Sequence, residues 1–132
     1  MFRELLFVHI VAVCMWLGGQ LFMLAVVVPA FRSKDRAERG EIIRRVGQQF
    51  LVVSGPVLVV ILVTGAMMAS DNGMFTANTP AFQWKMVSVA VVLISTVVHV
   101  IAARLGKIRL SRIATSLTGI ATLLAVWFAV HL

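Results

Sequence analysis

Four long apolar segments dominate the chain, and they span residues 5–31, 50–69, 86–103 and 113–132. A helix needs roughly 20 residues to cross the hydrocarbon core of a bilayer. Apolar residues follow one another without period-two alternation, which is typical of membrane helices and not of barrel strands. The pattern predicts an all-α integral membrane protein, a four-helix bundle in which residues 1–132 form a single four-span domain.

Composition agrees with a protein that lies in lipid. Apolar residues make up 61% of the 132-residue chain and charged residues 13%, against about 45–50% and about 25% in soluble domains. A soluble protein of this size could not bury so much apolar surface. The single cysteine, Cys14, cannot form an internal disulfide. These numbers exclude a secreted disulfide scaffold, a disordered chain and most soluble enzymes.

The basic residues that give the net charge of +7 gather in two loops. One loop holds Arg32, Lys34, Arg36, Arg39, Arg44 and Arg45, and the other holds Arg104, Lys107, Arg109 and Arg112, which leaves Arg3 and Lys85 elsewhere. Because cytoplasmic loops are enriched in Lys and Arg, both basic loops should be cytoplasmic and both termini should face outward. We expect a multi-pass protein of the inner membrane, with the lipid bilayer and not nucleic acid as its partner.

Polar residues within the spans fall on two helical stripes. Successive 100° steps place the members of each stripe within about 40° of one line. The stripes consist of His9, Val13, Trp16, Gln20 and Met23, and of Lys85, Ser88, Val92, Ser95 and His99. Both should face the interior, because polar side chains in lipid are costly. Trp16, Gln20, Met23, Ser88 and Ser95 could then line a path, although interhelical hydrogen bonding is favoured for the serines.

Small residues suggest close packing elsewhere. Thr115, Thr118 and Thr122 form a stripe typical of a helix-packing face, and Gly18, Gly19 and Gly65 fit points of close approach. Pro56, within the second span, should bend its helix. Ile42, Ile43 and Val46 lie at helical spacing, so the second helix should begin before the membrane.

Methionine and histidine collect at the outer ends of the spans. His9, Met67, Met68 and His131 form a candidate metal set there, because thioether and imidazole ligands suit Cu(I). The alternative is ordinary packing, in which methionine is common. His99 lies about fourteen residues into its span and His9 about five into a parallel one, so they should differ in depth by roughly 13–15 Å. The two histidines are therefore not expected to bind one metal ion or one haem iron.

Two families resemble the chain. The opening helix, with His9, Trp16, Gly18-Gly19 and Pro29, resembles CopD-like membrane proteins, as do Thr64-Gly65, Thr79-Pro80 and Lys85 further on. This resemblance implies copper handling or transport across the inner membrane, with a periplasmic copper carrier as partner. The chain also resembles the HemJ-like family. The resemblance rests on a histidine early in the first span, His9, on Trp84-Lys85 before the third span, and on His99 further along it. That likeness implies a haem b protein, a protoporphyrinogen oxidase or an electron-transfer protein, in which His9 is the sole axial ligand of one haem or His9 and His99 bind different haems.

Three functions therefore stay open. The leading one is copper handling, with His9, Met67, Met68 and His131 as ligands; the others are haem binding and a structural accessory subunit of a larger membrane complex. A homo-oligomer is plausible for so small a bundle. The spans contain no nucleophile–base pair, no phosphate-binding glycine loop and no intramembrane carboxylate. We therefore expect no ordinary hydrolase, kinase or proton pump, and an enzyme is the less favoured class.

Overall fold

In the computed structural model the described residues are 2–77 and 79–131, and they form helices without strands. The elements are α1 (Phe2–Phe22), the π-helical η1 (Met23–Val27), α2 (Val28–Ala30), α3 (Arg36–Asp71), α4 (Met74–Ala77), α5 (Pro80–Arg104) and α6 (Ile108–Val130). Four stretches are long and apolar enough to cross a membrane: Phe2–Ala30, Arg36–Asp71, Pro80–Arg104 and Arg109–Val130. The all-α class and the multi-pass membrane character are confirmed.

The helices extend beyond the expected spans, for local reasons. Helix α3 begins at Arg36, so it starts before its apolar part, as expected. Helix α5 begins at Pro80 and not near residue 86, because Thr79 caps it. Thr79 Oγ1 accepts a hydrogen bond from the Phe82 amide at 3.3 Å, and Pro80 supplies the preferred first helical residue. Helix α6 runs from Ile108, and the expected end of its span at residue 132 lies outside the described residues.

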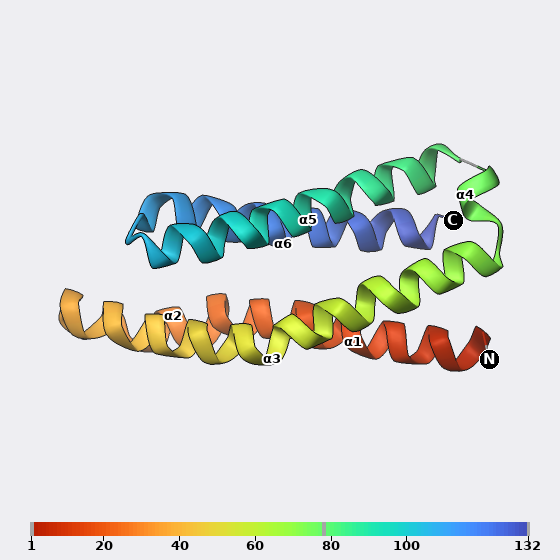
Figure 1. The fold of residues 1–132 in the computed structure, drawn as a ribbon. Coiled ribbons are helices and arrows are strands. Elements are labelled where there is room, and N and C mark those ends of the chain that lie inside the picture. Colours follow the sequence, from red (N-terminus) through yellow and green to blue (C-terminus); the bar gives the residue numbers. More distant parts are fainter. Residues whose placement is uncertain (1, 78, 132) are drawn as a thin grey trace. The chain divides into compact units, whose positions relative to one another are not determined.

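Both prolines inside the spans leave a mark on the backbone. Before Pro29 the helix widens into η1, where the Val28 amide donates to the Met23 carbonyl. The extra residue in this turn relieves the clash between the proline ring and the carbonyl four residues earlier. Helix α3 continues through Pro56, and Figure 1 shows that it changes direction near its middle. The bend expected at Pro56 is present, whereas the π-helical turn was not expected.

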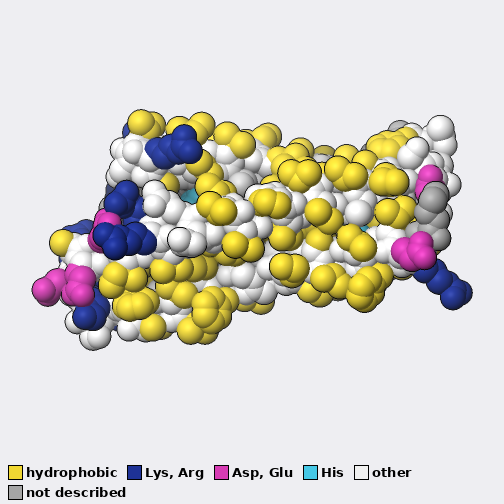
Figure 2. Space-filling model, turned by 60° about the horizontal axis from the view of Figure 1, so that its bottom comes forward, with side chains coloured by type: hydrophobic (Ala, Val, Ile, Leu, Met, Phe, Trp, Pro, Cys, Tyr) yellow, Lys and Arg dark blue, Asp and Glu magenta, His cyan; other side chains and the backbone are white. Residues whose placement is uncertain are grey.

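The chain divides into two compact units, Met1–Asn72 and Gly73–Leu132. In the first, α1 packs along α3, and in the second, α5 packs along α6 (Figure 1). Each unit is thus a helical hairpin whose helices run in opposite directions. Figure 2 shows hydrophobic side chains over the middle parts of the helices and Lys and Arg near helix ends. This distribution is what a bilayer demands of a spanning helix.

A tight turn joins the helices of the second hairpin. Gly106 has a φ of 68°, a left-handed conformation that glycine adopts without strain. The Lys107 amide donates to the Ala102 carbonyl at 2.9 Å, and the Gly106 amide to the Ala103 carbonyl at 3.3 Å. This pair of bonds is a Schellman motif, which ends α5 and lets α6 begin two residues later.

Candidate functional site

The polar stripe of α1 faces inward, as its spacing predicts. Trp16 is buried, and His9 and Gln20 are half-buried. Cys14 and Met15, which lie off the stripe, are exposed. The first stripe of the sequence is thus a packed face, and its members contact neighbours that the sequence did not identify.

His9 lies against α3 at Thr64. Its Nδ1 is 2.8 Å from Thr64 Oγ1, and Thr64 Oγ1 is 2.6 Å from the Val60 carbonyl. A hydroxyl has one proton, and the carbonyl can only accept, so Thr64 donates to Val60 and accepts from His9. The proton of the neutral imidazole therefore lies on Nδ1, and the lone pair lies on Nε2. Thr64 thus fixes both the tautomer and the orientation of the ring.

Gly65 leaves the space that the His9 ring occupies. A Cβ atom at position 65 would lie 3.1 Å from His9 Cε1, which is tighter than nine in ten real contacts of this kind. Thr64 and Gly65 together form a seat for the ring, one by hydrogen bonding and the other by the absence of a side chain. The sequence contains Thr64-Gly65, but nothing in the sequence assigned the pair to His9, because 55 residues separate His9 from Thr64.

The methionines of the candidate metal set follow this seat along α3. Met68 lies four residues after Thr64, on the same side of the helix, and is half-buried. Met67 is 44% exposed. His9 therefore binds α3 one helical turn before the methionine pair. The three residues belong to one hairpin. They lie at the end of it where α1 begins and α3 ends.

His131 belongs to the other unit. It is exposed at the end of α6, where its Nδ1 donates to the Trp127 carbonyl at 2.8 Å and its ring lies tilted against that of Trp127, with the ring centres 4.6 Å apart. These local contacts account for its position. Nothing in the structure places it beside His9, so its membership of the metal set stays a prediction.

Aromatic packing fills the next turns of the first hairpin. The rings of Trp16 and Phe50 lie 6.5 Å apart. A Cβ atom at Gly19 would overlap the Phe50 ring, whereas one at Gly18 would meet nothing within 4 Å. Gly19 is therefore a point of close approach, as expected, and the same expectation for Gly18 is wrong, because Gly18 lies on the exposed side of α1. Met23 opens the π-helical turn and is half-buried.

One hydroxyl in this hairpin is left without a partner. Ser54 is 4% exposed, and its Oγ has no hydrogen bond within the described part of the chain. It lies on α3 two residues before Pro56.

The hydroxyls of the second hairpin bond across its interface or to their own helix. Ser95 Oγ lies 2.7 Å from Thr118 Oγ1, while each also contacts a carbonyl of its own helix. Ser88 Oγ donates to the Trp84 carbonyl at 2.9 Å. Ser95 thus makes the interhelical bond favoured by its spacing, and Thr118 and Thr122 are buried, so the threonine stripe is a packing face.

His99 lies near the cytoplasmic end expected for this hairpin. Its Nδ1 is 2.9 Å from Thr115 Oγ1 and 3.2 Å from the Ser111 carbonyl. Thr115 itself contacts the same carbonyl at 3.0 Å, which again favours a proton on Nδ1. Both histidines within the spans are thus oriented by threonine. They belong to different units, so the expected difference in depth stays a prediction.

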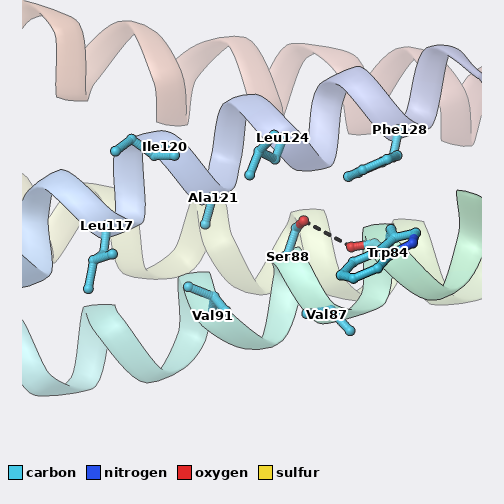
Figure 3. Close-up of a pocket in the computed structure, with 9 residues that line it drawn as sticks. All are labelled: Trp84, Val87, Ser88, Val91, Leu117, Ile120, Ala121, Leu124 and Phe128. Carbon is cyan, nitrogen blue, oxygen red and sulfur yellow. Dashed lines mark hydrogen bonds between the residues drawn. The ribbon is translucent and has the colours of Figure 1, made fainter.

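An apolar groove of about 440 Å³ runs between α5 and α6. Figure 3 shows Trp84 and Phe128 at one end, with Leu117 and Val91 towards the other. The two end rings stack at 6.5 Å. Ser88 is the polar residue among those that line it, and its hydroxyl is bonded to Trp84. The groove therefore offers contact area to apolar groups and little hydrogen bonding.

Among the described residues, no three side chains of His, Cys, Asp or Glu come close enough to share a metal ion. The candidate set at the first hairpin relies instead on thioether sulfur, from Met67 and Met68.

Comparison with known proteins identifies the family. A family model described as a domain of unknown function, DUF4149, matches residues 11–104. The chain belongs to the DUF4149 family. The match begins two residues after His9 and includes Thr64 and Gly65, the seat of its ring. No curated protein and no solved structure matched the DUF4149 chain.

Proposed function

We propose that this DUF4149 protein handles Cu(I) in the inner membrane, with a binding site at the outer end of the first hairpin. The observation that supports the proposal is the hydrogen bond between His9 Nδ1 and Thr64 Oγ1. Histidines that bind metals almost always donate their other ring N–H to an oriented acceptor. The geometry of His9 has this form, and it directs metal binding to Nε2.

The nature of the neighbouring side chains favours Cu(I) over harder ions. Met67 and Met68 follow the His9 seat along α3, and thioether with imidazole is a soft ligand set. Carboxylates, which Mg²⁺ or Ca²⁺ would need, are absent from the apolar parts of both helices in the sequence. His9, Met67 and Met68 are therefore the proposed ligands, and His131 is a fourth candidate.

The rest of the α1 stripe suggests how copper would move. Trp16, Gln20 and Met23 follow His9 at helical spacing, and Gln20 and Met23 supply an amide and a thioether on a largely apolar face. With the termini outside, copper would enter at His9 from a periplasmic carrier. In a homo-oligomer or a larger complex, side chains of neighbouring chains would line the remaining sides of this path.

The test is metal stoichiometry of the purified chain, loaded with Cu(I) under reducing conditions. We expect about one copper per chain. His9→Gln and the double variant Met67→Leu with Met68→Leu should each lower this value, because imidazole and thioether ligands are lost. His99→Gln is the matched control, since it removes a threonine-bound histidine of the other hairpin.

The outcomes separate the three functions. Copper that is unchanged in the His9 variant, although the variant keeps the thermal stability of the wild type, would refute the proposal. Stoichiometric iron with a haem spectrum would replace it by the haem b function. Absence of both metals, together with co-purification of a larger complex, would favour the accessory subunit.

A further inference from the structure

The turn between α5 and α6 carries unneutralised positive charge. Arg104, Lys107, Arg109 and Arg112 lie within nine residues, and no acidic residue follows Asp71 in the sequence. All four cations are exposed. Within the described residues, none of them forms an ion pair. A strong positive field therefore persists at this end of the hairpin.

The other basic segment is different, because its own carboxylates offset half of its positive charge. Lys34 lies 3.1 Å from Glu38, and Arg44 and Arg45 each lie 2.9 Å from Glu41. The first segment has six cations and three acids, a net charge of +3, whereas the shorter α5–α6 turn has four cations and no acid, a net charge of +4. In the α5–α6 turn all four cations are without an ion pair in the described part of the chain, whereas Lys34, Arg44 and Arg45 of the other segment are paired.

An apolar groove begins directly beneath these cations. It encloses about 170 Å³ between α5 and α6, and its walls include Ile94, Leu110 and Ile113. Ile94 is 65% exposed and Ile113 is 59% exposed, so the groove is an open surface and not a sealed cavity. Leu110 lies three residues after Lys107, which places that cation about one helical turn from the groove.

We propose that this end of the second hairpin binds an anionic phospholipid. Arg109, Arg112 and Lys107 would contact the phosphate, and one acyl chain would lie in the groove between Ile94 and Ile113. Phosphate is recognised by arginine through paired N–H donors. A zwitterionic lipid would place its ammonium group in the same uncompensated positive field, so the site should discriminate by headgroup charge.

A lipid bound here would also stabilise the α5–α6 hairpin. The negative charge of the headgroup would offset part of the repulsion among the four cations around a tight glycine turn. The acyl chain would cover apolar side chains that α5 and α6 leave exposed. This function is independent of copper binding, because it lies in the other unit.

The experiment measures lipid retention by the full chain, delipidated in detergent and titrated with phosphatidylglycerol or phosphatidylcholine of equal chain length. Native mass spectrometry counts the bound lipids. We expect phosphatidylglycerol to bind and Arg109→Gln with Arg112→Gln to weaken it about thirtyfold, since each cation near an anionic surface contributes substantially. The matched control is Arg44→Gln with Arg45→Gln, which also removes two positive charges and should weaken binding less than about threefold.

A second variant tests the groove. Ile113→Ser should weaken the binding of long-chain phosphatidylglycerol, because it removes an apolar side chain that contacts the acyl chain. A short-chain analogue should bind weakly to the wild type and to the variant. Equal losses in the two arginine pairs would overturn the proposal, because they would report general surface charge. Equal retention of phosphatidylcholine, or displacement of the lipid by millimolar inorganic phosphate, would overturn it as well.

Discussion

Replacing Thr64 by valine isolates the single contact that orients His9. Valine has nearly the shape of threonine, so the substitution removes a hydroxyl and leaves no cavity. The His9 Nδ1 proton then loses its acceptor, whereas the Val60 carbonyl keeps its place in the α3 ladder. The variant therefore changes the hydrogen bonding of one imidazole and little else.

The expected magnitude follows from what each partner loses. Interhelical hydrogen bonds in membranes contribute about 0.6 kcal/mol on average and at most about 1.7 kcal/mol. Leaving a half-buried N–H without a partner adds a desolvation penalty. We expect the free energy of unfolding to fall by about 1–2 kcal/mol. Because the partner of a ligating histidine typically contributes 10–100-fold to metal affinity, Cu(I) binding should weaken by about that factor.

Thr118→Val is the matched control. It also removes an interhelical contact between hydroxyls, but Ser95 retains its bond to the Val91 carbonyl, so nothing is stranded. We expect a loss of about 0.6 kcal/mol and no change in copper affinity. Thr64→Ser, which keeps the hydroxyl, should restore copper affinity.

Stability would be measured by reversible unfolding in mixed micelles, and affinity by competition with a chromophoric Cu(I) chelator. A Thr64→Val variant that binds copper as tightly as the wild type, although nitrogen NMR shows that His9 has lost its Nδ1–H hydrogen bond, would refute this role of Thr64. An equal loss of copper affinity in Thr118→Val would refute it as well.

Two further predictions concern packing and topology. Gly19→Ala should destabilise the first hairpin by about 1–3 kcal/mol in a thermal melt, because its methyl group overlaps an aromatic ring of α3. Gly18→Ala should be neutral or stabilising by up to about 1 kcal/mol, and equal effects at the two positions would contradict the packing. In a background without Cys14, a cysteine at Asn72 should react with an impermeant thiol reagent added outside intact cells, and one at Ser33 should react only after lysis. The reverse pattern would refute the expected orientation.

Much of the helical architecture follows from the sequence because lipid imposes simple requirements. A backbone in hydrocarbon must satisfy its own hydrogen bonds, so a long apolar segment is a helix. Helical geometry then places Trp16 and Ser95 on inward faces and Cys14 and Met15 on exposed ones, as the structure confirms. The start of α5 depends on capping by Thr79, a local signal that the apolar pattern does not contain.

The partners across each hairpin were decided only by the tertiary structure. Thr64 and Gly65 are a common pair of residues in a span until the register of α1 against α3 brings His9 to them. The same register places Gly19 against the Phe50 ring, where a Cβ atom would overlap it, and leaves Gly18 facing open space. The two basic segments differ already in sequence, because Asp35, Glu38 and Glu41 lie in the first and no acidic residue lies in the second. The structure adds that Lys34 pairs with Glu38 and that Arg44 and Arg45 pair with Glu41. Apolar length and periodicity specify helices and their faces one at a time, whereas contacts between residues far apart in the chain depend on how two faces interlock.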